Sequence, residues 1–142
     1  MNAENRHISK IDSLTLLRDA LLPNLLKEDE EDILYWAGKE LARSYQFDSL
    51  KDLMQQTETF FAGKLIQTKS TKKTVCFDWT GPLVTHRLTE QAAPTFSLEA
   101  GFLAEGFQQL SGNYTEATYS IYQKKHLVTF LLQSDAHVSL DD

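Results

Sequence analysis

The stretch LEAGFLAEGF, residues 98–107, decides the fold of this chain, because it combines a helical apolar pattern with two glycines. Gly101 and Gly106 each cost about 1 kcal/mol relative to alanine inside a helix, so tight packing against another backbone must compensate. The small residue Gly38, in an earlier helical pattern, permits the same close approach. We therefore assign Gly38, Gly101 and Gly106 to helix close-packing.

Four helices are expected around this stretch. The helix that contains it should run from about residue 99 to 110, with Gly112 just past its end. Three helical patterns precede it, at residues 12–22, 30–45 and 50–61. Pro23 should end or kink the first, and Ser49 should cap the third. In the second, Ile33, Trp36 and Leu41 are among the residues expected to face inward.

The remaining segments have the period of strands. Strands are expected at residues 65–69, 74–80, 83–88, 114–123 and 126–134. The resulting order, ααα-βββ-α-ββ, lacks the regular alternation of a parallel sheet. It predicts an α+β fold, with helices packed on one face of a mostly antiparallel sheet.

Composition restricts the class of protein. The chain has 142 residues, a net charge of −6 and a single cysteine. A length of this order predicts one domain over residues 1–142, with an ordered core of about 12–134 and flexible ends. The acidic balance argues against nucleic-acid binding, and no apolar run predicts a membrane span or a signal peptide. We expect a cytoplasmic protein.

An acidic run at residues 28–32 holds much of the negative charge. It precedes a helical pattern that carries Lys39 and Arg43 in its later turns. Acids at the start of a helix and bases near its end are favoured by the helix dipole. We interpret the run as helix capping in preference to a docking patch for a basic partner or a cation site.

No sequence motif for catalysis, metal binding or nucleotide binding is present. His86 is placed on a strand, where a general base or a haem ligand is conceivable, but a solvated or hydrogen-bonded ring is favoured. Cys76 lies between Val75 and Phe77 and is expected to be a buried, inert thiol. We predict no catalytic residue, no metal and no cofactor, and hence a protein that is not an enzyme.

Three stretches of the chain together resemble the YslB-like proteins, a family of small cytosolic proteins of Gram-positive bacteria. They are YWAGK with LAR (residues 35–43), GP with RL (residues 81–88), and FSLEAGFLAE (residues 96–105). The resemblance covers residues 12–133.

That family in turn is similar to a larger group of folds, those of nitric-oxide signalling and Golgi transport. The group includes vinyl-reductase-type ligand-binding domains, haem-dependent nitric-oxide sensors and TRAPP vesicle-tethering subunits. The segment GFLA followed by Gly112 and a terminal hairpin resembles the end of the vinyl-reductase-type domains. The cysteines that those domains commonly carry near the last hairpin are missing from residues 114–134, so the resemblance implies neither a metal nor a cluster.

Two main functions are compatible with the sequence, and an enzyme of unknown reaction ranks third. The first is non-catalytic binding of a small apolar ligand between helices and sheet, as in a sensor. Its expected pocket consists of Tyr35, Trp36, Phe61, His86, Arg87 and Phe102. The second is a homodimeric interaction or scaffold domain without a ligand, because TRAPP-like relatives associate through helices. A space enclosed by Trp36, Phe61 and Phe102 would favour the ligand, and a filled interior the scaffold.

Overall fold

The computed structural model describes residues 10–139. Most of the residues predicted to be flexible, 1–9 and 140–142, lie outside the described residues. His7 is among them. Strand β4 continues to Ser139, beyond the ordered core expected to end near residue 134.

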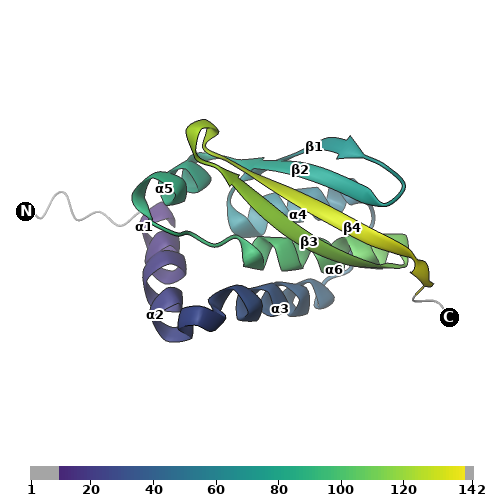
Figure 1. The fold of residues 1–142 in the computed structure, drawn as a ribbon, viewed down its shortest axis with the longest axis horizontal. Helices are drawn as coiled ribbons and strands as arrows, with labels where there is room; N and C mark the ends of the chain where they lie inside the picture. Colours follow the sequence, from purple (N-terminus) through teal and green to yellow (C-terminus); the bar gives the residue numbers. More distant parts are fainter. Residues whose placement is uncertain (1–9, 140–142) are drawn as a thin grey trace, which may run out of the picture.

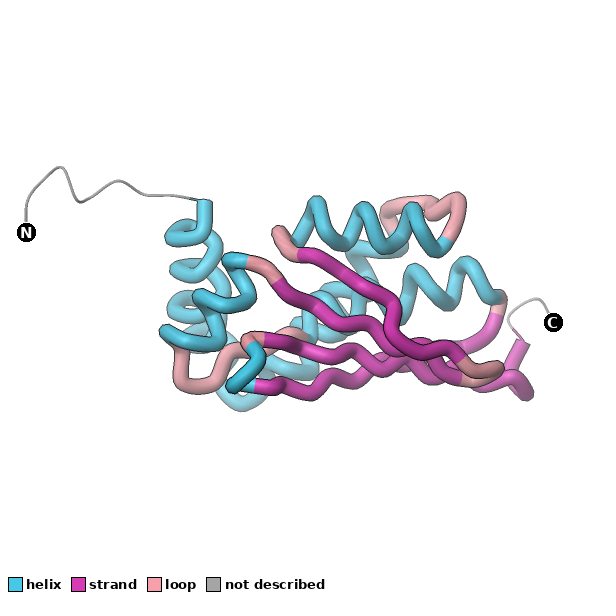
Figure 2. The backbone as a smooth tube through the Cα atoms, turned by 90° about the horizontal axis from the view of Figure 1, so that it is seen from above, coloured by secondary structure: helices cyan, strands magenta, loops and turns pink. Residues whose placement is uncertain are grey.

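The α+β class is confirmed. Strands β1 (Lys64–Ser70), β2 (Thr74–Thr80), β3 (Asn113–Tyr122) and β4 (Leu127–Ser139) form one antiparallel sheet in the order β1-β2-β4-β3. A turn at Gln123–Lys125 closes the β3–β4 hairpin. Figure 1 shows helices α4 and α6 crossing behind this sheet, and Figure 2 shows the strands as one twisted layer with most helical turns on one side.

Local sequence signals set the boundaries of the main helices. Helix α3 spans Glu30–Arg43, α4 spans Leu50–Phe61 and α6 spans Ser97–Ser111. The predicted cap of α4 is confirmed, since the Ser49 hydroxyl accepts a hydrogen bond of 3.1 Å from the Asp52 amide. Gly112 ends α6 in the left-handed conformation, with φ 74°. The first turn of α3 carries Glu30, Glu31 and Asp32, as the capping interpretation of the acidic run requires.

The third predicted strand is wrong. Residues 83–88 belong to helix α5, Pro82–Glu90, so His86 lies on a helix. The buried side chains of α5 are Leu83, Val84, Arg87 and Leu88, which is the spacing of one helical face. The N-cap of the helix is Gly81, with φ 135°, followed by Pro82 at the first helical position. The strands expected at residues 74–80 and 83–88 would instead place a turn at these two residues.

The chain begins with a segment that we call the N-terminal arm, residues 10–26. It consists of α1 (Lys10–Thr15), a π-helix (Leu16–Leu21) and α2 (Leu22–Leu26). The helix does not end at Leu22 as expected: helical turns continue through Pro23 to Leu26, and the change at Leu22 is from π-helix to α-helix. Figure 1 places the arm at one end of the molecule, beside α5.

The core lies between the sheet and helices α4 and α6. Alternate residues of the central strands face it, namely Val75, Phe77 and Trp79 in β2 and Val128, Phe130 and Leu132 in β4. Helix α6 adds the fully buried Phe102 and Leu103. Helix α3 packs directly on α6: a β-carbon on Gly101 would lie 2.9 Å from the Tyr35 carbonyl carbon, and one on Gly38 would lie 2.8 Å from the Phe102 amide nitrogen. Gly106 instead faces the side chains of Leu53 and Phe47.

Candidate functional site

A groove of about 550 Å³ lies where α3, α6 and β3 meet. We call it the α3–α6–β3 groove. Helix α3 provides Glu31, Asp32 and Tyr35, helix α6 provides Ser97 and Ala100, and strand β3 provides Glu116, Ala117, Thr118 and Tyr119. Its lining combines two aromatic rings and two alanines with three carboxylates.

Tyr35 joins the helical and strand walls of the groove. Its hydroxyl oxygen accepts a 3.0 Å hydrogen bond from the Ala117 amide, which belongs to the edge strand β3. The neighbouring outward amide of that edge, at Thr115, donates to the Gln108 side chain at 3.0 Å. Burial, together with the nearby Glu116 carboxylate, raises the pKa of Tyr35 above its usual value. Tyr35 is therefore neutral at physiological pH.

Tyr119 and Glu31 form a second contact between β3 and α3, one helical turn before Tyr35. The Tyr119 hydroxyl donates a hydrogen bond to Glu31 Oε1, and the Ser97 hydroxyl donates to the same oxygen at 3.2 Å. Burial raises the pKa of Tyr119 to about 12, and the bond to Glu31 acts in the same direction. Tyr119 thus keeps its proton at neutral pH and acts as a hydrogen-bond donor, and the Glu31 carboxylate is held in place by two hydroxyl groups.

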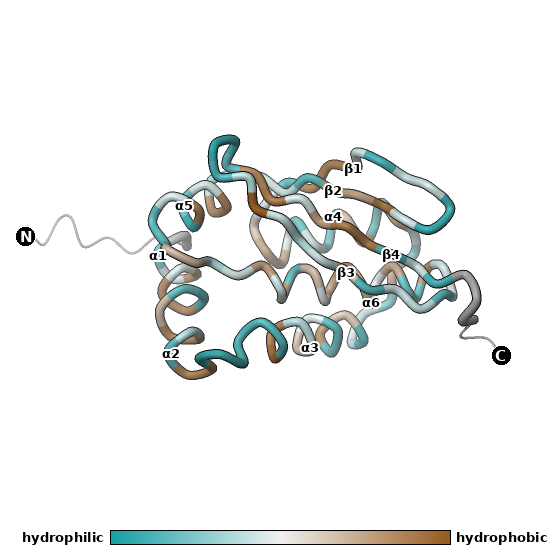
Figure 3. Tube along the Cα trace, viewed as in Figure 1, coloured by the Kyte–Doolittle hydropathy of each residue, from teal (hydrophilic) through white to brown (hydrophobic). Residues whose placement is uncertain are grey.

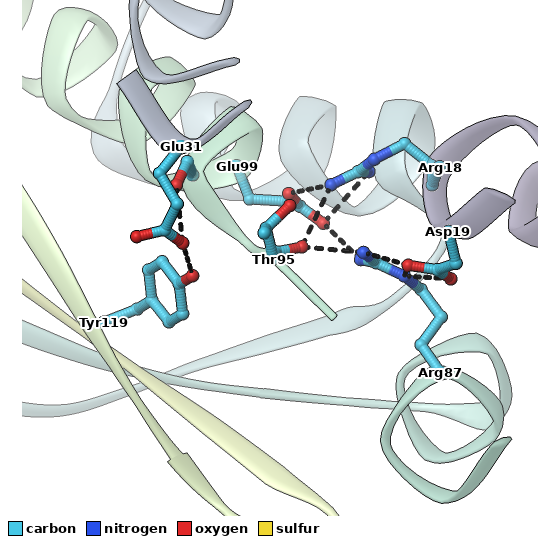
Figure 4. A network of polar contacts seen from close by, with 8 residues as sticks. Arg18, Asp19, Glu31, Arg87, Thr95, Glu99 and Tyr119 are labelled. Carbon is cyan, nitrogen blue, oxygen red and sulfur yellow. Dashed lines mark hydrogen bonds and ion pairs between the residues drawn. The ribbon is translucent and has the colours of Figure 1, made fainter. Parts of the chain in front are cut away.

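A buried ion-pair cluster adjoins the groove and connects the N-terminal arm to the body (Figure 4). Arg18 of the arm donates to Glu99 Oε1 of α6 at 2.8 Å. Asp19 of the arm accepts three hydrogen bonds from Arg87 of α5, at 2.8, 2.9 and 3.1 Å. Both arginines also donate to the Thr95 carbonyl oxygen, at 3.4 and 2.7 Å. All four charged side chains are less than one-tenth exposed.

The cluster contains more carboxylates than guanidinium groups. Glu30, at the start of α3, is buried, and this burial together with Asp19 raises its pKa, while Arg18 and Arg87 act in the opposite direction. Burial lowers the pKa of Arg18, but Glu99, Asp19 and Glu30 raise it by more, so the guanidinium is charged. Arg18 Nε, Glu30 Oε2 and Thr95 Oγ1 are buried without a hydrogen-bond partner among the residues that the structure describes.

The expected pocket residues do not share one cavity. Tyr35 lines the groove, whereas Trp36, which was expected to face inward, is 61% exposed. Ile33 and Leu41 also face solvent, since α3 turns Leu34, Gly38 and Ala42 toward the body instead. Phe61 and Phe102 pack edge to face in the core, with ring centroids 5.3 Å apart. The ring of Phe102 also contacts Phe47 and Phe60. Aromatic rings therefore fill the space around Phe102.

The other two expected residues lie on α5. Arg87 is 1% exposed and bound to Asp19, while His86, the preceding residue, is half-buried and lines neither the groove nor the ion-pair cluster. Cys76 is half-buried as well, which corrects its expected burial, because β2 turns Val75 and Phe77 toward the core.

Sequence reasoning missed most of the groove and half of the cluster. Glu31 and Asp32 were explained by helix capping, and Ser97, Glu116 and Tyr119 carried no motif. Polar residues occupy alternate positions of β3, at Glu116 and Thr118. This alternation was the signal in the sequence for a strand face open to solvent. The partners of Arg18 and Arg87 lie 81 and 68 residues away along the chain, so sequence spacing alone could not pair them.

Two further findings concern the described residues. Within residues 10–139, no helix is both long and apolar enough to cross a membrane. Over the same range, no group of three or more His, Cys, Asp or Glu side chains is arranged to hold a metal ion.

The fold is similar to those of solved sensory and transport domains. The phenol-responsive sensory domain of the transcription activator PoxR, solved with phenol, superposes with a TM-score of 0.60 at 14% identity, covering 90% of this chain and 76% of that one. A trafficking protein particle complex subunit 3 from Naegleria fowleri, covalently bound to palmitic acid, gives 0.58 at 11% identity, covering 90% and 96%. The Fe(II) unliganded H-NOX protein from K. algicida gives 0.51 at 12% identity, covering 87% and 72%. Likeness at such identities shows the fold alone.

Sequence comparison shows the family. The chain is 32% identical over 120 residues to the uncharacterized protein YslB of Bacillus subtilis (strain 168), covering 84% of this chain and 81% of that protein. The resemblance to YslB-like proteins is thereby confirmed. The model of one family, described as a protein of unknown function (DUF2507), matches residues 12–133. The chain therefore belongs to the DUF2507 family.

Proposed function

We propose that this chain is a non-catalytic small-molecule-binding module of the sensor type, and that its ligand occupies the α3–α6–β3 groove. The observation that carries the proposal is the groove itself. Its volume of about 550 Å³ lies within the roughly 300–1,000 Å³ of typical ligand pockets. The rings of Tyr35 and Tyr119 offer an apolar surface, and the surrounding carboxylates and hydroxyl groups offer polar contacts that orient a ligand.

The filled core moves the proposed site away from the space between helices and sheet. Phe47, Phe60 and Phe61 surround the ring of Phe102, so an apolar ligand there would have to displace aromatic packing. The groove needs no such displacement. Similarly folded proteins bind small molecules: the PoxR domain was solved with phenol, and the trafficking subunit with palmitic acid. These similarities support the class of function and leave the ligand of this chain open.

The test is a screen of small aromatic and alkyl molecules by NMR, followed through the backbone amides of Ala117 and Thr118 in the groove. A Thr118→Trp variant places a large ring at the groove wall and should abolish any binding that the screen detects. Ser120→Trp is the matched control, because Ser120 is exposed on the same face of β3 and does not line the groove. Binding that survives Thr118→Trp, or none across the screen, would contradict the proposal.

A second proposal is that the chain forms a homodimer through the N-terminal arm. Leu16, Leu17, Leu21 and Leu25 are 46–68% exposed along the arm, and Figure 3 shows hydrophobic residues at this end of the molecule. Clusters of exposed apolar side chains on a helix are typical of interaction surfaces. Sedimentation at micromolar concentrations should show a dimer that is lost in the Leu16→Ser/Leu25→Ser double variant. A strict monomer would contradict this proposal.

A further inference from the structure

The charge distribution around the α3–α6–β3 groove identifies a class of ligand. Resting on the function proposed above, we infer that the groove binds an organic cation: a primary ammonium group attached to an aromatic or alkyl group.

The first argument is the charge of the lining. Glu31, Asp32 and Glu116 contribute three carboxylates, and no basic side chain lines the groove. Residues 10–139 contain no ion pair that uses any of the three carboxylates. Charges on two helical residues and one strand residue face the same space, so their fields add at a ligand there. An anion would be repelled, and a neutral molecule would gain no net Coulombic attraction from this arrangement.

The second argument is the aromatic surface. Tyr35 and Tyr119 present rings to the groove, and the faces of aromatic rings attract cations. The chain already uses this interaction beside the groove, where the Lys39 ammonium lies 5.1 Å from the centre of the Tyr35 ring and 5.5 Å from that of Tyr114. Lys39 lies one helical turn beyond Tyr35, on the α3 side of the site. The Tyr35 ring thus accepts an ammonium group in the folded protein.

The third argument is the fixed position of one carboxylate. Glu31 accepts hydrogen bonds from the hydroxyl groups of Tyr119 and Ser97, both on Oε1. Its second oxygen, Oε2, makes no hydrogen bond within the described residues and is available to a donor. Tyr119 keeps its proton far above neutral pH, so this arrangement persists under physiological conditions. A donor of the –NH₃⁺ type would gain a charge-assisted hydrogen bond to a pre-oriented acceptor.

The experiment compares two probes with one skeleton, phenethylamine and 2-phenylethanol, by NMR titration of the full chain at pH 7. The first is a cation at this pH and the second is neutral. Phenethylamine should shift the amides of Ala117 and Tyr119 and bind at least tenfold more tightly than 2-phenylethanol. Its affinity should fall when the salt concentration rises from about 0.05 to 0.5 M, because salt screens the interaction of exposed charges.

The matching variant is Glu31→Gln/Asp32→Asn/Glu116→Gln, which keeps the size of each side chain and the hydrogen bonds from Tyr119 and Ser97. It should weaken phenethylamine binding at least tenfold and leave 2-phenylethanol unchanged. Glu90→Gln, an exposed acid of α5 outside the groove, is the control and should change neither. Circular dichroism of each variant checks that its fold is intact.

The outcomes separate this inference from the proposed function. Equal affinity for both probes at the groove, or phenethylamine binding that the triple variant leaves intact, overturns the cation inference while the binding function stands. Failure of phenethylamine to shift the groove resonances also overturns the inference. If no molecule in the screen of small aromatic and alkyl compounds described above binds to the groove, the binding function itself is overturned.

Discussion

Helix α6 and the N-terminal arm bury opposite kinds of residue. In α6 every residue from Ser97 to Gly106 except Leu98 is buried, and most of these are apolar or glycine. In the arm, the buried side chains among residues 12–26 are those of Thr15, Arg18 and Asp19, and four leucines, Leu16, Leu17, Leu21 and Leu25, face outward. Helix α6 is thus held by apolar packing and close backbone contact, whereas the arm is held mainly by ion pairs to Glu99 and Arg87. This difference predicts that the arm can detach at a lower free energy than that needed to unfold the body.

The largest effect should come from the crossing of α3 and α6. In Gly101→Ala the new methyl group would overlap the Tyr35 backbone, which cannot move independently of α3. We expect a loss of unfolding free energy of about 3 kcal/mol or more, by thermal or urea denaturation. Gly106→Ala is the comparison, since its methyl group meets the flexible ends of Leu53 and Phe47 and also gains about 1 kcal/mol of helix propensity. Equal losses in both variants would contradict the backbone-contact interpretation.

The next effect should come from the ion pairs of the arm. Arg87→Met leaves the buried Asp19 carboxylate without its partner, which typically costs about 3–5 kcal/mol where the charge stays buried. Here the arm can release Asp19 to water, so we expect a smaller loss, about 1–3 kcal/mol, with the arm detaching first. Hydrogen exchange should show amides of residues 16–26 losing protection while those of α6 keep theirs. Uniform loss of protection would show that the arm and the body unfold together.

A smaller effect on the unfolding free energy should appear at alkaline pH. It should arise from Tyr119, which belongs to the body and not to the arm. Tyr119 ionises at a pH of about 12 in the folded chain, and near 10 in the unfolded chain. Because the folded pKa is the higher one, the stabilising contribution of Tyr119 is complete below about pH 10 and is lost as the pH rises toward 12. Stability should therefore decline less steeply in Tyr119→Phe than in the parent chain. Identical slopes in denaturant titrations across this range would contradict the raised pKa.

The smallest effect should come from the outward face of the arm. Leu25 is 64% exposed, so Leu25→Ser should change the unfolding free energy of the monomer by no more than about 0.5 kcal/mol. Leu53→Ala, at a fully buried position, should cost about 2–5 kcal/mol. A large loss in Leu25→Ser that grows with protein concentration would show that a second copy covers the arm.

The sequence predicted local structure well where one signal dominated. Ser49 and Gly112 marked helix ends, and the alternation from Val75 to Trp79 marked a buried strand face. The prediction failed at residues 83–88, where Gly81-Pro82 is compatible with both a turn and a helix start. It also failed at Trp36, because a one-residue difference in helical phase rotates a side chain by about 100°.

The site depended on contacts that sequence spacing does not record. Tyr35 was identified for its aromatic character, but its role in the groove depends on Ala117, 82 residues further along the chain. The groove exists because the glycines at the α3–α6 crossing bring α3 to the edge of β3. Such a juxtaposition follows from packing, and no local pattern around Glu31 or Tyr119 indicates it.

The side chains that cover strand β3 determine how the sheet can extend between molecules. Another chain pairing along β3 would have to displace Tyr35 and Gln108 from the amides of Ala117 and Thr115. The opposite edge, β1, has no such cover over most of its length. Two copies that pair through β1 would each present outward a β3 edge on which the amides of Thr115 and Ala117 are already bonded, which disfavours further pairing there. The molecule therefore has a built-in barrier to filament growth through its sheet.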